Sequence, residues 1–318
     1  MHHEPRKILI AVDGSEQSLA CVNYAAGMLA GTKSQITLFS VLNTVPEAYW
    51  DLEQYPGYSH RVQSLHAWAV AQKRGIELFM DNARALIMKH RFHSDSVIVK
   101  VCDRKVGIAR DIAFEAGQGY DALVVGRTGV SRIKDLILGS VANKLLTRSM
   151  EVPLWLIGGN PKPGRVILAV DRSDNAMKAT EYAGKMLAGT PNRIMALSVL
   201  RGVQTFIRGP EGMVMPSLDE EGIAKAVNEL KTAELTPVFD QVKGILEKEG
   251  MDLKQVSTRI ITDSLSRAES IVSEARSGGF ETMVVGRRGL SRVQEFFMGR
   301  VGHKVVQMAH SEAVWVIP

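Results

Sequence analysis

The chain contains the same short sequence twice, and this internal repeat limits its possible folds more than any other feature. The sequence VVGRTGVSR begins at Val124, and VVGRRGLSR begins 160 positions later, at Val284. The segment ILIAVD at Ile8 has a similar counterpart, VILAVD, at Val166. Because each copy of a long repeat folds into a similar unit, the sequence predicts two related domains.

The segment GGNPKPG, residues 158–164, marks the boundary between the two copies. Glycine and proline at this density prevent a helix or a strand ladder from continuing. We therefore predict a first domain at 1–158, a linker at 159–164 and a second domain at 165–318. Each half is long enough to bury roughly two thirds of its unfolded surface without disulfides.

Composition excludes several classes of protein. Only two cysteines occur, Cys21 and Cys102, so a disulfide framework is not indicated and a reducing compartment is expected. The net charge is +5, but the basic residues are scattered, whereas a nucleic-acid binder concentrates them on one face. No run of about twenty apolar residues occurs, and the first strand follows Met1 almost directly. We expect a cytoplasmic protein that binds neither nucleic acid nor membrane.

Strand-like and helix-like segments alternate along each half. The apolar segments are continuous rather than alternating, as in parallel strands covered on both faces. In the first half they span residues 7–12, 35–42, 96–102, 122–125 and 154–157. This order predicts right-handed crossovers and the α/β class: two tandem three-layer α/β/α sandwiches, each with a five-stranded parallel sheet.

Helical periodicity fills the intervals between these strands. Apolar residues share one face of a long second helix in the first half: Ile76, Phe79, Ala83, Leu86 and Ile87. Two further helices are predicted at 107–117 and 139–148. In open α/β sheets, ligands bind beyond the carboxyl ends of the strands, so we expect Asp13 and Gly126, each at the end of a strand, to line one crevice.

The glycines after the fourth strand indicate a phosphate site of a particular kind. The first strand is followed by Asp13-Gly14-Ser15 rather than by G-x-G-x-x-G, and no Walker A loop occurs. A response-regulator receiver domain has two adjacent acidic residues after its first strand. This chain has Val12 and a single Asp13 there, which argues against that class. What remains is G-x-x-G-x9-G-S, formed by Gly126, Gly129, Gly139 and Ser140. Such glycines bring backbone N–H groups close to an anion, and a helix opening at Gly139 adds its N-terminal amides.

This string resembles the nucleotide-binding signature of the universal stress protein family, G-2x-G-9x-G-(S/T), and the resemblance extends over nearly the whole chain twice. It implies the adenine nucleotide alpha hydrolase-like fold and an ATP site, with Mg²⁺ accompanying the triphosphate. The residues that we expect at this site are Asp13, Gly14, Val41, Gly126, Arg127, Gly129, Arg132, Gly139, Ser140 and Val141. Arg127 and Arg132 are included because they are close enough in sequence to neutralise the outer phosphates. In similar proteins the positions of Asp13 and Val41 meet the ribose and adenine.

Simpler structural interpretations exist for the same residues. Gly126 and Gly129 could form an ordinary tight turn, Asp13 could merely cap the first helix, and Arg127 and Arg132 could simply be exposed. The histidines, of which two lie near one another in the long helix region, show no metal-ligand pattern, and we expect no metal held by protein ligands alone. No arrangement of catalytic residues is evident from the spacing.

The second copy departs from the signature. Arg300 stands where the first copy has Ser140, and Arg172 stands where it has Gly14. A long side chain at this helix start could occupy the phosphate pocket or hold a phosphate by its guanidinium group. We expect one ATP per chain, in the first domain. A weaker second site, for a smaller anion or a monophosphate, would use Asp171, Val199, Gly286, Gly289, Gly299 and Arg300.

These patterns lead to one functional hypothesis and two alternatives. The leading hypothesis is an ATP-binding regulatory or protective module in the stress response, whose two halves form a pseudo-dimer. The family resemblance implies that the short last strands, residues 154–157 and 314–317, pair with each other and hide exposed sheet edges. A second association between chains, as a homodimer, and an unidentified protein partner remain open. The alternatives are a slow ATPase or self-phosphorylating protein, and a scaffold that works without nucleotide.

Overall fold

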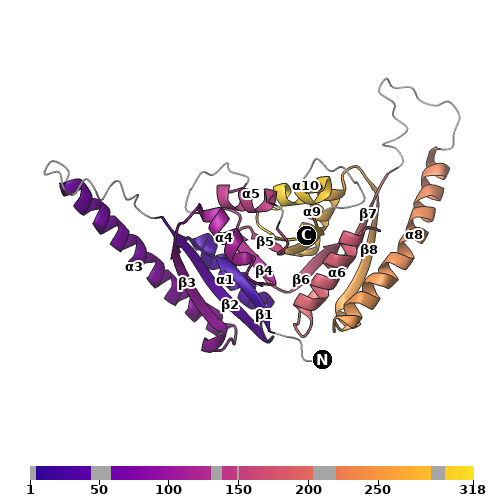
Figure 1. Ribbon diagram of the computed structural model, residues 1–318. Coiled ribbons are helices and arrows are strands. Elements are labelled where there is room, and N and C mark those ends of the chain that lie inside the picture. The colour runs from indigo at the N-terminus through magenta and orange to yellow at the C-terminus, as the bar shows by residue number, and fades with distance from the viewer. Residues whose placement is uncertain (1–4, 44–58, 130–137, 149, 203–219, 288–297) are drawn as a thin grey trace, which may run out of the picture. The chain divides into compact units, whose positions relative to one another are not determined.

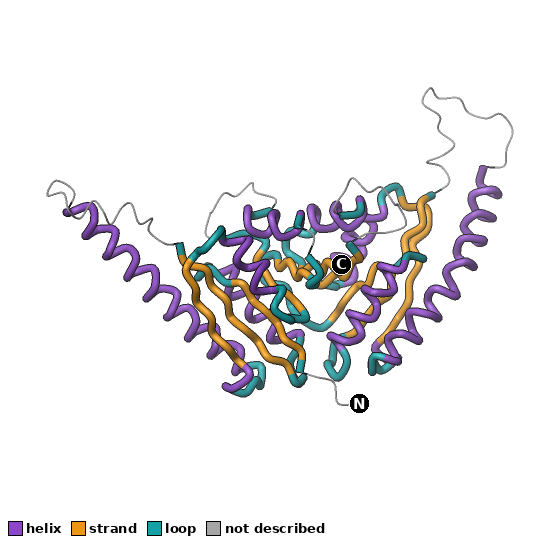
Figure 2. Tube along the Cα trace, in the orientation of Figure 1, coloured by secondary structure: helices purple, strands orange, loops and turns teal. Residues whose placement is uncertain are grey.

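The computed structural model describes the chain apart from residues 1–4, 44–58, 130–137, 149, 203–219 and 288–297 (Figure 1). The chain divides into two compact units, Met1–Val152 and Pro153–Pro318. Each unit alternates strands with helices (Figure 2). The predicted α/β class is confirmed.

The first unit contains a parallel sheet in the order β3-β2-β1-β4. Its elements are β1 (Arg6–Ala11), α1 (Glu16–Met28), β2 (Ser34–Leu42), α3 (Ser59–Lys89), β3 (Val97–Asp103), α4 (Ile108–Ala116), β4 (Ala122–Gly126) and α5 (Ser140–Thr147). The chain runs outward from β1 to β3 and then returns to β4. Right-handed crossovers therefore place α1 and α3 on one face of the sheet and α4 and α5 on the other.

The long helix α3 packs through only part of its length. Its buried residues begin at Ile76 and continue at helical spacing through Met80, Ala83 and Ile87, on the face turned to α1. Of the residues predicted for this face, Ile76, Ala83 and Ile87 are buried, whereas Phe79 and Leu86 are half-buried. The C-terminal half of α3 is thus the part that is anchored in the core.

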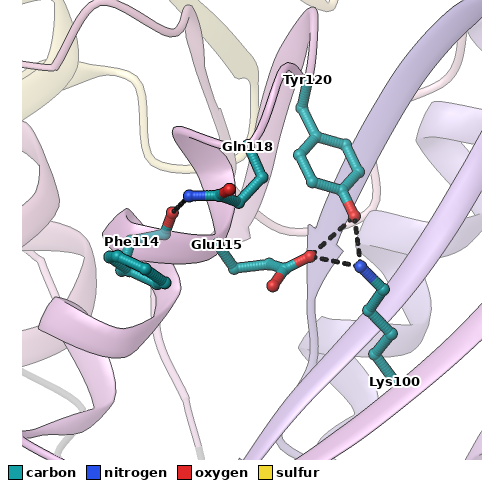
Figure 3. Close-up of polar contacts among 5 residues, drawn as sticks. All are labelled: Lys100, Phe114, Glu115, Gln118 and Tyr120. Carbon is teal, nitrogen blue, oxygen red and sulfur yellow. Dashed lines mark hydrogen bonds and ion pairs between the residues drawn. The ribbon is translucent and has the colours of Figure 1, made fainter.

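A polar cluster joins the edge strand β3 to α4 (Figure 3). Lys100 Nζ donates to Glu115 Oε1 at 2.7 Å, and the Tyr120 hydroxyl donates to the same oxygen at 2.9 Å. Burial raises the pKa of Glu115, but the bonds from Lys100 and Tyr120 outweigh it, and the pKa lies below its ordinary value. The second unit has a corresponding pair, Arg259 with Glu274 at 2.7 Å, so both halves fasten the edge strand in the same way.

The second unit contains strands in the order β5-β10-β9-β6-β7-β8. Its elements are β5 (Leu154–Ile157), β6 (Arg165–Ala169), α6 (Asp174–Leu187), β7 (Arg193–Arg201), α8 (Glu220–Lys248), β8 (Val256–Ser264), α9 (Arg267–Gly278), β9 (Thr282–Gly286), α10 (Arg300–Met308) and β10 (Ala313–Ile317). Five of its strands, β10 to β8 in this order, are parallel, as predicted.

Strand β5 pairs with β10 in antiparallel orientation, which confirms the predicted pairing of these two short strands. Trp155 lies directly opposite Trp315 in this register. Their rings are stacked, with centroids 3.8 Å apart and planes 5° from parallel. Trp155 Nε1 donates to the Tyr182 hydroxyl at 2.9 Å, so the one polar atom of that ring is satisfied in the core.

A buried carboxylate connects α9 to the start of β10. Glu312 has a side chain that is 7% exposed, and Arg276 Nε donates to its Oε1 at 2.8 Å. Arg276 Nη2 also donates to the Met308 carbonyl at 2.8 Å. Burial raises the pKa of Glu312, but the hydrogen bond and charge of Arg276 outweigh it, so the pKa lies below its ordinary value of 4.5.

This pair predicts a pH dependence of stability. Because the folded pKa of Glu312 lies below the unfolded value, its contribution is fully present above about pH 4.5 and is lost as the pH falls through the folded pKa. We expect Glu312→Gln to unfold at lower urea concentration than wild type at pH 7, and the difference to shrink on acidification. Glu247→Gln, at an exposed position of α8, is the control. A difference that grew with acidification would contradict this assignment.

Within the described part of the chain, no helix combines the length and the apolar character needed to cross a membrane.

Candidate functional site

The candidate site lies where the chain reverses its direction across the first sheet. Strand β1 has β2 on one side and β4 on the other. Ile10 of β1 is paired with Val124 of β4, so the two strands end next to each other. Asp13 follows β1, and Gly126 closes β4. Because the strands are parallel, both loops emerge at the same carboxyl edge.

The start of α5 lies against the loop after β4. Gly139 N donates to the Arg127 carbonyl at 2.8 Å. A Cβ at Gly139 would stand 3.2 Å from that oxygen, closer than most side chains come to backbone, and 3.8 Å from Gly129 N, in ordinary contact. The glycines of the signature therefore touch one another across nine intervening residues. We call residues 126–129 with 139–140 the first cradle.

The carboxylate of Asp13 completes this arrangement. A Cβ at Gly129 would lie 2.7 Å from Asp13 Oδ2, so the carboxylate occupies the place of that missing side chain. The other oxygen, Oδ1, accepts from Ser15 N at 3.1 Å and from the hydroxyls of Ser15 and Ser18 at 2.6 and 2.5 Å. The N-cap of α1 is Ser15, whose hydroxyl accepts from Ser18 N, so the interpretation of Asp13 as the cap is wrong.

Residues that the sequence pattern did not single out support the loops from below. A Cβ at Gly126 would meet Gln17 Cγ at 2.9 Å and the Thr128 carbonyl at 3.0 Å. Gly14 has φ +82°, a left-handed conformation, and its Cβ position lies 3.8 Å from Ile76 Cδ1 of α3. Ser18 and Gln17 lie in the first turn of α1.

The remaining predicted residues lie in different surroundings. Arg127 is 4% exposed, so its interpretation as a simply exposed residue is wrong. Val41 is half-buried near the end of β2, whose Phe39 carbonyl accepts from Val12 N at 2.8 Å. Ser140 is exposed at the start of α5, and Val141 is half-buried. Arg132 lies outside the described residues.

The second unit repeats this geometry at the junction of β6 and β9. Gly299 N donates to the Arg287 carbonyl at 2.7 Å, as Gly139 does in the first cradle. Asp171 Oδ1 accepts from Ser173 N at 3.0 Å and from its hydroxyl. Gly286 approaches the Asn175 carbonyl, with 3.1 Å from its Cβ position. We call residues 286–287 with 299–300 the second cradle; Gly289 lies outside the described residues.

Two long side chains distinguish the second unit from the first. Arg172 Nη1 donates to Glu234 Oε2 of α8 at 2.8 Å, and both side chains are more than half exposed. Arg300 occupies the first position of α10 and is exposed. Val199 is buried in β7, at 7% exposure.

Burial shifts the pKa of two titratable side chains in the first unit. His90 Nε2 lies 2.9 Å from Asn23 Oδ1, and burial lowers the pKa of this histidine. Burial raises the pKa of the Cys21 thiol, which lies beneath Gly126. Groups of three or more His, Cys, Asp or Glu that could hold a metal ion do not occur among the described residues.

Comparison with known proteins agrees with this architecture. The family model described as "Universal stress protein family" matches residues 4–157 and again 163–318. Universal stress protein YxiE of Bacillus subtilis is 29% identical over 147 residues, which cover 46% of this chain and 93% of that protein.

Solved structures that align with nearly the whole chain share its fold. A universal stress protein from Archaeoglobus fulgidus DSM 4304 has a TM-score of 0.62 at 18% identity, with 99% of each chain covered. A putative universal stress protein from Pseudomonas aeruginosa UCBPP-PA14 has a TM-score of 0.51 at 15% identity, covering 98% of this chain and 93% of that one. Since the family model matches both halves, this chain belongs to the universal stress protein family and carries its domain twice in tandem.

Proposed function

We propose that the first unit binds ATP, and that the protein acts as a nucleotide-dependent regulatory or protective module. The observation that carries this proposal is the contact of Asp13 with the position of the missing Gly129 side chain, beside Gly139 at the start of α5. A side chain at Gly129 would collide with Asp13, and one at Gly139 would crowd the Arg127 carbonyl, so the close approach of these loops requires glycine. Backbone N–H groups at a glycine loop and at a helix N-terminus are suited to phosphate oxygens.

Six of the predicted residues have a proposed role in this binding. The backbone of Gly126, Gly129 and Gly139 and the Ser140 hydroxyl would hold the phosphates. Asp13 would accept from the ribose hydroxyls, and the backbone at Val41 would meet the adenine. Mg²⁺ would be bound chiefly by the phosphates, as it is in many nucleotide sites. The residues contribute positioning, so we propose regulated binding rather than rapid hydrolysis.

The second cradle supports a weaker proposal. It keeps the contact between Gly299 and the loop after β9, but Arg172 and Arg300 add long side chains where the first unit has Gly14 and Ser140. We propose that this half binds no ATP and that, at most, it takes a small anion. The chain would then bind one ATP in total.

The test is the identification of the nucleotide and its stoichiometry. Purified protein is denatured, and any released nucleotide is identified by chromatography and mass. Protein stripped of ligand is then titrated with ATP and Mg²⁺ by calorimetry, with one equivalent per chain expected. A chain that releases no nucleotide and shows no heat of binding would refute the proposal, and two equal sites would refute the assignment to the first unit.

A steady-state assay separates this proposal from the ATPase alternative. We expect wild type and Ser140→Ala to release phosphate at the same background rate, because the proposed role of Ser140 is to bind the phosphates and not to activate a water molecule. A wild-type rate well above background that disappears in Ser140→Ala would instead favour the enzyme.

A further inference from the structure

We infer that the residue pair at positions 172 and 234 determines which half of the chain accepts a nucleoside; this inference rests on the proposed function and deepens it. The pair consists of Arg172, in the loop after β6, and Glu234, on the long helix α8. Its two side chains meet at 2.8 Å and join the loop to the helix. The corresponding loop and helix of the first unit carry no such connection, as the equivalent residues show.

The equivalent residues are both glycines. Arg172 follows Asp171 as Gly14 follows Asp13. On the long helices, the buried residues align with one another, so that Leu235 of α8 corresponds to Ile76 of α3 and Glu234 corresponds to Gly75. The same correspondence matches three further buried pairs: Met80 with Phe239, Ala83 with Val242, and Ile87 with Leu246. An arginine and a glutamate thus stand where the first half has Gly14 and Gly75.

Few described atoms lie near the two glycines: a Cβ added at Gly14 would have Ile76 Cδ1 at 3.8 Å, in ordinary contact. A Cβ added at Gly75 would meet no atom of the described residues within 4 Å. Gly14 adopts φ +82°, which a non-glycine residue rarely takes, whereas Arg172 is not in the left-handed region. The loop after the first strand therefore follows a different backbone path in the two halves. In the first half this loop passes the long helix with glycine at both positions, Gly14 and Gly75, whereas in the second half both positions carry long side chains.

The location of the pair connects it to the nucleoside rather than to the phosphates. Arg172 is the neighbour of Asp171, and the proposed ribose ligand of the first half is the equivalent Asp13. The second cradle, which would hold phosphates, lies at β9 and α10 and keeps its glycine contact. A bridge beside Asp171 would therefore close the ribose and adenine end, whereas at the anion end Arg300 is exposed and can hold a phosphate by its guanidinium group.

The experiment measures the number of ATP molecules bound per chain in matched variants. Wild type is expected to bind one equivalent. Arg172→Gly/Glu234→Gly, which copies the first half, is expected to gain a second equivalent. Arg172→Met/Glu234→Met removes both charges but keeps long side chains, and it is expected to stay at one. Equilibrium dialysis with ATP and Mg²⁺ gives the stoichiometry, and circular dichroism confirms that each variant is folded.

The reciprocal change keeps the inference testable if the first variant does not fold. Gly14→Arg/Gly75→Glu is expected to reduce ATP binding from one equivalent to none. The inference would be overturned if either double variant, Arg172→Gly/Glu234→Gly or Gly14→Arg/Gly75→Glu, were folded and still bound the same number of ATP molecules as wild type. Two equivalents in wild type would also overturn it, whereas no binding by wild type would refute the proposed function itself.

Discussion

Gly129→Val is expected to weaken ATP binding about 100-fold, because it should remove about two charge-assisted hydrogen bonds worth roughly 1.5 kcal/mol each. The first atom of the new side chain would lie 2.7 Å from Asp13 Oδ2, so either the loop or the carboxylate must move. Asp13 is held on its other oxygen by Ser15 and Ser18, which limits how far it can shift. Gly129 is not in the left-handed region, so the backbone itself tolerates valine.

A matched substitution distinguishes a local effect from a general one. Gly244→Val places the same side chain in α8, where a Cβ comes within 4 Å of no atom in the part of the chain that the structure describes. It should leave ATP affinity unchanged, and the melting temperatures of both variants should stay close to that of wild type. Calorimetric titration measures the affinities. Affinity within twofold of wild type for Gly129→Val would place the phosphate site elsewhere.

Trp315→Ala is expected to cost about 3–5 kcal/mol of the free energy of unfolding. The ring is fully buried, stacks on Trp155 at 3.8 Å and receives the edge of Tyr182 at 6.1 Å. Its removal leaves a cavity at the centre of the β5–β10 ladder and deprives Trp155 of its stacking partner. Urea unfolding, followed by far-ultraviolet circular dichroism, measures this cost.

Trp68 provides the control for this substitution. It lies on α3 with 46% exposure, so Trp68→Ala should change the free energy of unfolding by no more than about 0.5 kcal/mol. Trp315→Ala should also change the near-ultraviolet circular dichroism spectrum, which Trp68→Ala should leave nearly unchanged, because Trp315 is buried and stacked whereas Trp68 is exposed. Equal costs for the two substitutions would show that the stacked pair does not stabilise the second unit.

Most of the fold could be predicted from the sequence because its signals are local. Continuous Val, Ile and Leu segments identified the strands, and helical periodicity identified the helices between them. The predicted helices at 107–117 and 139–148 differ by one residue at each end from Ile108–Ala116 and Ser140–Thr147. Repetition of the same order in both halves predicted two units of one kind.

Part of the candidate site could be predicted as well. Gly129 and Gly139 could be predicted from their spacing, and Asp13 from its position directly after a strand. Ser18 and Ile76 could not be found in this way, because a serine in a first turn and an isoleucine in a helix are ordinary there. Their importance arises from contacts with Asp13 and Gly14, which depend on how α1 and α3 pack.

The sequence alone determined the order of elements, the repeat and the glycine spacing, since each of these depends on neighbours along the chain. Only the tertiary structure decided that Leu154–Ile157 pairs antiparallel with β10 in the register that stacks Trp155 on Trp315. It also decided that Arg172 pairs with Glu234, 62 positions away. Such contacts depend on packing between distant segments, and a local pattern of residue types contains no record of that packing.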